Sequence, residues 1–126
     1  MLTSTIVVPT YNERYNLLEL AQGVTMLGDS VRLIIVDDAS PDGTGELADA
    51  LAKEFAHVSV IHRAAKWGRG TAYVEGFRRA LADGADYIFS MDGDLAPAPQ
   101  YIPQFWNALD SHDVVIGSRY LHGISE

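Results

Sequence analysis

The feature that most constrains the fold of this chain is a regular alternation of short apolar runs with segments of helical periodicity. A short apolar run bounded by turn residues is typical of a buried strand. Alternation of such strands with amphipathic helices predicts an α/β fold with a mostly parallel sheet and helices on both faces. At 126 residues the chain is expected to form one domain. The expected strands are Thr5–Val8, Arg32–Val36, Val58–Ile61, Tyr87–Met91 and Val114–Ile116.

Apolar residues at helical spacing predict which faces of the intervening helices are buried. In the first helix these residues are Leu17, Leu20, Ala21, Val24 and Leu27. In the second they are Leu47, Leu51 and Phe55, and in the third, from Thr71 to Asp83, they are Ala72, Tyr73, Phe77, Ala80 and Leu81. A fourth helix is expected after Pro97, Pro99 and Pro103, with Phe105, Trp106 and Leu109 facing inward. Asp42 or Thr44 is the expected N-cap of the second helix.

Charge and composition exclude several classes of function. The formal net charge of −8 disfavours binding to nucleic acid, because an acidic surface repels phosphates. The absence of cysteine excludes disulfides and thiolate metal sites. No apolar run approaches the length of a membrane span, and no signal peptide precedes the first strand, so we expect a soluble, cytoplasmic protein.

Five of the nine basic residues are concentrated in one short stretch. They are Arg63, Lys66, Arg69, Arg78 and Arg79. This stretch could bind a phosphate or an anionic lipid surface, or it could form an ordinary solvated loop and helix face. The loop from Arg63 to Gly70 contains glycines but matches neither the P-loop nor the GxGxxG spacing, so its indication of phosphate binding is weak. His57 and His62 flank the third strand and are expected to be structural.

The acidic triplet Asp92-Gly93-Asp94 follows the fourth expected strand directly. In open α/β sheets ligands bind beyond the carboxyl ends of the strands. A tight turn at Gly93 would let both carboxylates reach one ligand. Mg²⁺ is usually held by one or two carboxylates together with substrate phosphates. The triplet therefore predicts a divalent-metal site, with Asp92 and Asp94 as ligands, for a nucleoside diphosphate.

Polar residues also follow the first and second strands. Pro9 sets the direction of the chain at the end of the first strand, the ring of Tyr11 can flank a base, and Glu13 can accept hydrogen bonds from a nucleoside. The alternative for this segment is a simple turn and helix cap. Asp38 is assigned to contact with a ribose hydroxyl or a base N–H, whereas Asp37 is expected to cap the following turn.

The fifth expected strand is followed by Gly117-Ser118-Arg119-Tyr120. The guanidinium of Arg119 can bind a phosphate through a planar, bidentate pair of donors. A surface arginine without such a role is the alternative.

Four motifs together resemble glycosyltransferase family 2, and within it the dolichol-phosphate (polyprenol-phosphate) mannosyltransferase group. They are Val7–Glu13, Val36–Thr44, Met91–Asp94 and Gly117–Tyr120. The resemblance covers essentially the whole chain and implies a GT-A fold, a Rossmann-like nucleotide-binding domain. It also implies an enzyme that moves a sugar, mannose from GDP-mannose, to a polyprenyl or dolichyl phosphate with inversion.

The resemblance also implies roles for individual residues. Pro9, Tyr11, Glu13, Val36 and Asp38 would hold the nucleoside. Asp92, Gly93 and Asp94 would hold the diphosphate and Mg²⁺ or Mn²⁺. Asp94 and Arg119 would act in catalysis, with Arg119 at the phosphate region shared by donor and acceptor.

Two departures from the family pattern leave other functions open. Ala96 and Pro97 stand where family members have a polar residue and a histidine, and Ala96 has no side chain that could ligate a metal. Family members also continue well beyond residue 126, so residues 1–126 are expected to be the donor-binding domain without the acceptor part. The full-length enzyme would then work at the inner face of a membrane.

The alternatives are a non-catalytic nucleotide-sugar-binding fragment, a family 2 transferase that uses a UDP-sugar and a glycan acceptor, and a nucleotidyltransferase. The last is weakened because no glycine-rich, lysine-bearing loop follows the first strand.

Overall fold

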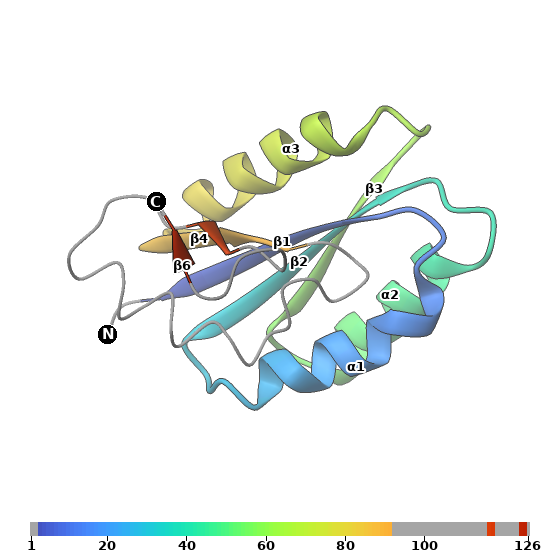
Figure 1. Ribbon diagram of the computed structural model, residues 1–126. Helices are drawn as coiled ribbons and strands as arrows, with labels where there is room; N and C mark the ends of the chain where they lie inside the picture. The colour runs from blue at the N-terminus through green and yellow to red at the C-terminus, as the bar shows by residue number, and fades with distance from the viewer. Residues whose placement is uncertain (1–2, 92–115, 118–123, 126) are drawn as a thin grey trace.

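The computed structural model describes residues 3–91, 116–117 and 124–125, and its main element is a four-stranded parallel sheet (Figure 1). The strands are β1 (Ser4–Thr10), β2 (Val31–Asp38), β3 (Val58–Arg63) and β4 (Tyr87–Ser90). The helices between them are α1 (Arg14–Thr25), α2 (Thr44–Glu54) and α3 (Arg69–Ala82). The first four expected strands and the three helices between them are thereby confirmed. None of the described helices is long and apolar enough to cross a membrane.

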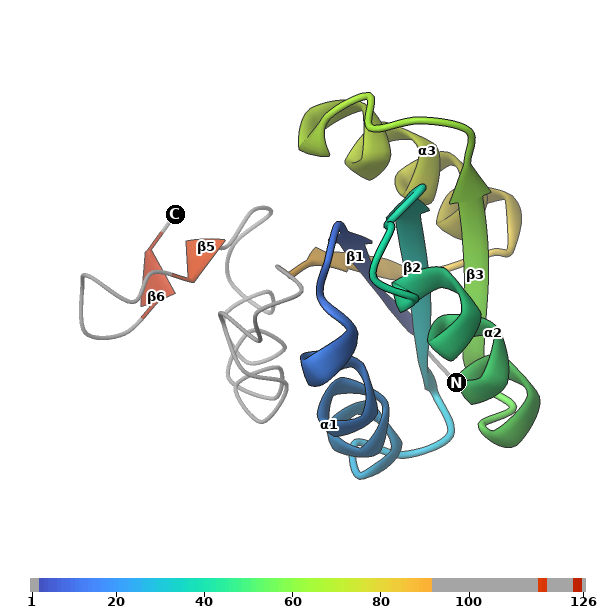
Figure 2. The same ribbon diagram turned by 90° about the vertical axis from the view of Figure 1, so that its right-hand side faces the viewer.

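Helices cover both faces of the sheet, as expected. Figure 2 shows α1 and α2 on one face and α3 on the other. Because side chains alternate along a strand, Ile6 and Val8 belong to the buried cluster beneath α1 and α2, whereas Val7 belongs to the cluster beneath α3. β1 and β2 are central strands that are covered on both sides, which explains why their sequences are almost continuously apolar.

The helices bury most of the residues that their periodicity indicated. Leu17, Leu20, Ala21 and Val24 of α1 are fully buried, and Leu27 packs against the same cluster. The expectation for Leu81 is wrong, because its side chain is 65% exposed. Leu81 lies in the last turn of α3, where helical spacing alone does not show how far the sheet beneath extends.

The N-cap expected for α2 is also corrected. The capping position is Gly43, whose φ of 90° places it in the left-handed region, which a glycine adopts without strain. Asp42 still acts locally, since its carboxylate accepts a hydrogen bond from the Thr44 N–H at 3.0 Å. The sequence therefore predicts the turn before α2 correctly, but the N-cap lies one residue away from each of the two expected positions.

Strand order determines where a ligand can bind. The order in the sheet is β3-β2-β1-β4, so the chain steps outward from β1 to β3 and then returns through α3 to the other side of β1. The boundary between β1 and β4 is thus a topological switch point, the place where open α/β sheets bind ligands at the carboxyl ends of the strands.

The fifth strand differs from the expectation. The described strand β5 is Ile116–Gly117, and it pairs antiparallel with β6, Ile124–Ser125, in a separate two-stranded sheet. A short apolar run such as Val114–Ile116 indicates an extended segment but carries no information about its partner. Val114, Val115 and the expected fourth helix lie outside the described residues.

Candidate functional site

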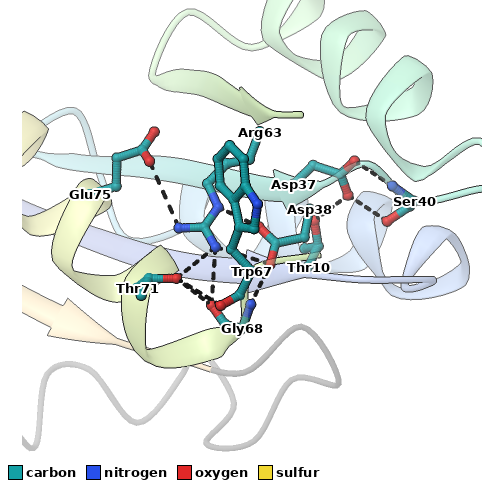
Figure 3. Close-up of polar contacts among 9 residues, drawn as sticks. All are labelled: Thr10, Asp37, Asp38, Ser40, Arg63, Trp67, Gly68, Thr71 and Glu75. Atoms are coloured by element: carbon teal, nitrogen blue, oxygen red, sulfur yellow. Dashed lines mark hydrogen bonds and ion pairs between the residues drawn. The ribbon is translucent and has the colours of Figure 1, made fainter. Parts of the chain in front are cut away.

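The carboxyl ends of β1, β2 and β3 bring Thr10, Asp38 and Arg63 together at one edge of the sheet (Figure 3). The register aligns Thr10 with Asp37 and Asp38 with Arg63. These polar side chains are almost entirely buried, and each has a partner. Such burial indicates a preorganised edge rather than a set of freely moving surface groups.

Asp37 stabilises the turn that follows β2, as expected. Its carboxylate accepts hydrogen bonds from the Thr10 hydroxyl at 2.8 Å, the Ser40 N–H at 3.1 Å and the Ser40 hydroxyl at 2.6 Å. Between Asp37 and Ser40, Ala39 has a φ of 51°, a conformation that is unfavourable for alanine. The hydrogen bonds of Asp37 hold this turn in place and leave its carboxylate committed to structure.

Asp38 forms a buried ion pair with Arg63. Nε of Arg63 lies 2.7 Å from one carboxylate oxygen and Nη2 lies 3.3 Å from the other, and the two side chains are only 2% and 6% exposed. The Gly68 N–H also donates to Asp38 Oδ2, at 3.2 Å. The carboxylate assigned to nucleoside contact is therefore held in one orientation from two directions.

Arg63 also connects β3 with the start of α3. Its Nη2 donates to the Thr71 hydroxyl at 2.7 Å and to the Gly68 carbonyl at 3.2 Å, while Nη1 lies 3.8 Å from Glu75 Oε1. The exposed ring of Trp67 covers the guanidinium at 5.2 Å from the ring centroid. Arg63 is therefore neither a solvated side chain nor a free phosphate ligand, the two roles considered for the basic stretch.

Tyr11 lies at the end of β1 with its side chain partly exposed. The ammonium of Lys66 lies 4.3 Å from the centroid of its ring. Lys66 comes from the loop after β3, so this contact connects the first and third strands across the end of β2. The sequence singled out Tyr11 for a base but gave Lys66 no partner.

The remaining nucleoside candidates occupy different environments. Pro9 and Val36 are paired in the register of β1 and β2, and the side chain of Val36 is fully buried beneath α3. Glu13 accepts a hydrogen bond from the Asn16 side chain at 3.1 Å, and its own N–H donates to the Thr44 hydroxyl at 3.1 Å. Glu13 is thus half-buried at the start of α1, whereas Val36 belongs to the core beneath α3 and has no exposed side chain.

Hydrogen bonding lowers the pKa of Asp42 in the turn before α2. The main cause is the hydrogen bond that its carboxylate accepts from the Thr44 hydroxyl, and the N–H of Thr44 adds to the effect. The ionised form of Asp42 therefore stabilises the turn that places Thr44 beneath the N–H of Glu13.

The residues expected to bind the metal and the phosphates lie outside the described residues. They are Asp92, Gly93, Asp94 and Arg119. Within the described ranges, no group of three or more His, Cys, Asp or Glu residues could hold a metal ion. His62 pairs with Asp49 at 2.8 Å and His57 with Thr25 at 3.1 Å, which agrees with structural roles for both histidines.

Sequence comparison gives a consistent set of relatives. A model of the family described as "Glycosyl transferase family 2" matches residues 5–126. Over 120 residues the chain is 42% identical to the polyprenol monophosphomannose synthase of Mycolicibacterium smegmatis, covering 94% of this chain and 45% of that protein. It is 44% identical over 120 residues to the undecaprenyl-phosphate mannosyltransferase of Micrococcus luteus, covering 93% and 48%. The chain thus spans less than half the length of these two curated relatives.

Solved structures have the same fold. The mannosyltransferase PcManGT from Pyrobaculum calidifontis, in complex with GDP-Man and Mn²⁺, matches with a TM-score of 0.66 and 25% identity over 84% of this chain and 31% of that one. The glucosyl-3-phosphoglycerate synthase from Mycobacterium tuberculosis, in complex with Mn²⁺, UDP and glucosyl-3-phosphoglycerate, matches with a TM-score of 0.66 and 24% identity over 89% of this chain and 41% of that one. These likenesses confirm the expected α/β architecture.

Proposed function

Since this chain belongs to glycosyltransferase family 2 and has the GT-A fold, we propose that it is the donor-binding domain of an inverting mannosyltransferase. The donor would be GDP-mannose and the acceptor a polyprenyl phosphate at a membrane surface. The observation that best supports this proposal is the edge at the ends of β1 and β2, where exposed Tyr11 follows β1 and the fixed carboxylate of Asp38 ends β2. The names of the curated relatives supply the sugar and the class of acceptor.

The nucleoside would bind over the ends of β1 and β2. The ring of Tyr11 offers an apolar face to a base, and Asp38 offers a hydrogen-bond acceptor. A carboxylate can accept about four hydrogen bonds, and Asp38 receives three from Arg63 and Gly68. One acceptor position therefore remains for a ribose hydroxyl or a base N–H, already oriented before the ligand arrives.

The metal would be held by carboxylates that follow β4, on the other side of β1. Asp37 and Asp38 do not fit this role, because Asp37 is committed to Thr10 and Ser40, and Asp38 is already paired with the cationic guanidinium of Arg63, which would repel a metal ion. Asp92 and Asp94 fit it by chemistry, since oxygen ligands suit both Mg²⁺ and Mn²⁺. When bound, the cation would neutralise charge on the diphosphate.

In the reaction, an oxygen of the lipid phosphate would attack the anomeric carbon in line, and the nucleoside diphosphate would leave from the opposite side. A phosphate monoester has a second pKa of about 6, so the nucleophile is already mostly ionised at neutral pH and needs no strong general base. Arg119 would bind the phosphate region through its planar pair of donors. The residues of this domain would therefore act mainly by binding and orienting the donor.

A second candidate is a domain that binds a nucleotide-sugar without transferring the sugar. Ala96 favours it, because this residue offers no side-chain ligand where family members have a polar one. Metal-dependent hydrolysis of the donor would distinguish the two candidates, since it requires the transferase site to be chemically competent.

The proposal is tested by calorimetric titration of the chain with GDP-mannose and UDP-glucose, with and without Mn²⁺ or Mg²⁺. We expect metal-dependent binding of GDP-mannose, lost in Asp92→Ala and Asp94→Ala. Asp29→Ala, a substitution of an exposed aspartate, is the control and should bind normally. Preference for the uridine donor would overturn the mannosyl assignment, and metal-independent binding would overturn the role of the two carboxylates.

A further inference from the structure

Lys66 lies in the loop between β3 and α3, and its side chain contacts an aromatic ring at the end of another strand. Its ammonium lies 4.3 Å from the centroid of the Tyr11 ring, above the aromatic face at the end of β1. The chain has only one other lysine, Lys53 in the last turn of α2, which is exposed. A lysine over an aromatic face is held by cation–π attraction, yet it keeps N–H donors for other partners.

The loop that carries Lys66 is anchored from below. Two residues after Lys66, the N–H of Gly68 donates to Asp38 and its carbonyl accepts from Arg63. Between them, Trp67 packs over the guanidinium of Arg63. Because Arg63 is buried and paired, its contacts hold the loop in place. From this loop after β3, Lys66 reaches over the end of β2 toward β1.

Under the proposed function, Tyr11 flanks the base of the donor. A base that packs on the ring face over which Lys66 lies would displace the ammonium toward the rim of the ring, beside an edge of that base. Guanine presents two acceptors on one edge, N7 and O6, whereas adenine presents an N6 amino donor where guanine has O6. A lysine ammonium has three donors and no acceptor. It can therefore donate to both acceptors of the guanine edge, but on adenine it can donate only to N7 and has no acceptor for the N6 amino group.

We propose that Lys66 is a specificity-determining residue that selects a 6-oxopurine base by donating to its O6/N7 edge. The inference rests on the proposed function and adds a second recognition element to Asp38. The carboxylate of Asp38 would accept a hydrogen bond from an N–H group of the base, and the ammonium of Lys66 would donate hydrogen bonds to its acceptors. The two residues would therefore recognise different groups on one base. The buried ion pair with Arg63 fixes the orientation of the Asp38 carboxylate. The loop that is bound to Asp38 through Gly68 fixes the position of Lys66.

The test is calorimetric titration of the unsubstituted chain, Lys66→Met, Lys66→Arg and Lys53→Met with GDP, IDP, ADP and UDP, in the presence of Mn²⁺. IDP keeps O6 and N7 but lacks the 2-amino group, so it isolates the edge assigned to Lys66. We expect Lys66→Met to weaken the binding of GDP and IDP about tenfold, as for the loss of one base-edge contact, and to weaken that of ADP clearly less, because adenine offers the ammonium only N7. Lys66→Arg should retain the preference for GDP and IDP, and Lys53→Met should behave as the unsubstituted chain.

Two results would overturn the inference alone. Equal weakening of all four nucleotides in Lys66→Met would mean that Lys66 only supports the Tyr11 ring, and unchanged GDP binding would mean that it does not touch the base. If the unsubstituted chain bound none of the nucleotides, the proposed function would fail, and this inference with it. Failure of the inference is therefore distinguishable from failure of the function on which it rests.

Discussion

Arg63 and Asp38 form the interaction on which the residues of the candidate site depend most. A buried ion pair contributes little net stability compared with apolar packing, because both charges must be removed from water. Its effect here is to orient groups, since the same guanidinium contacts Asp38, Gly68 and Thr71. The ion pair therefore contributes the orientation of the Asp38 carboxylate rather than net stability.

We expect Arg63→Met to lower the free energy of unfolding by about 3–5 kcal/mol, because it leaves the Asp38 carboxylate buried without its partner. Arg79→Met is the matched control. It removes an exposed arginine that lies 3.4 Å from Asp83, and should cost less than about 1 kcal/mol. The measurement is urea denaturation followed by circular dichroism.

Adding Asp38→Asn to Arg63→Met should recover part of this loss, because the unpaired buried charge is then removed. If Arg63→Met cost no more than Arg79→Met, the ion pair would have to be solvated in solution, and the rigid edge would not exist.

Asp42 gives a prediction about pH. Because its pKa is lowered in the fold by the Thr44 hydroxyl, its contribution to stability is complete above the ordinary value of 3.8 and is lost as the pH falls through the lowered folded-state pKa. An NMR titration of its carboxyl carbon should give a midpoint below 3.8. In Thr44→Val, which lacks the hydroxyl donor, the midpoint should move upward. A midpoint at or above 3.8 in the unsubstituted chain would contradict the hydrogen bond.

At the scale of elements, the approach of α3 to the sheet depends on a glycine that the apolar pattern did not single out. A Cβ built on Gly76 would lie 2.2 Å from Cγ1 of Val7 and 3.3 Å from Cγ2 of Val36. No side chain fits there, so α3 packs with its backbone close to β1 and β2. The same helix carries Thr71 and Glu75 to Arg63, and its position therefore affects the candidate site.

Gly76→Ala should destabilise the fold by about 1–3 kcal/mol through overpacking, in spite of the higher helix propensity of alanine. Gly70→Ala, in the first turn of the same helix, is the control because a Cβ there meets nothing within 4 Å. That substitution should be neutral or slightly stabilising. Thermal unfolding of both variants provides the comparison.

Truncating Val7 makes room for the new methyl group, so Val7→Ala should cost less in the background of Gly76→Ala than in the unsubstituted chain. Purely additive effects of the two substitutions would mean that α3 shifts away from β1 rather than pressing on Val7.

At the scale of the whole molecule, a parallel sheet with helices on both faces could be predicted because its pattern is repeated along the chain. Each strand has apolar residues on both of its faces, and each helix has them on one face. Every segment therefore indicates the same architecture. β1, β2 and β3 extend further than the apolar runs that predicted them. β2 continues through Asp37 and Asp38, and β3 through His62 and Arg63, because backbone pairing continues where side chains become polar.

The sequence by itself determined the order of elements in residues 3–91, the carboxyl-edge location of Tyr11 and Asp38, and the family, since each rests on local pattern or motif. Only the tertiary structure decided that Arg63 is the partner of Asp38, that Lys66 reaches Tyr11, and that Leu81 is exposed. The physical reason is that these contacts join residues from different strands and loops. Such contacts depend on the register between neighbouring strands and on the distance between packed elements. The periodicity of a single segment predicts neither of these.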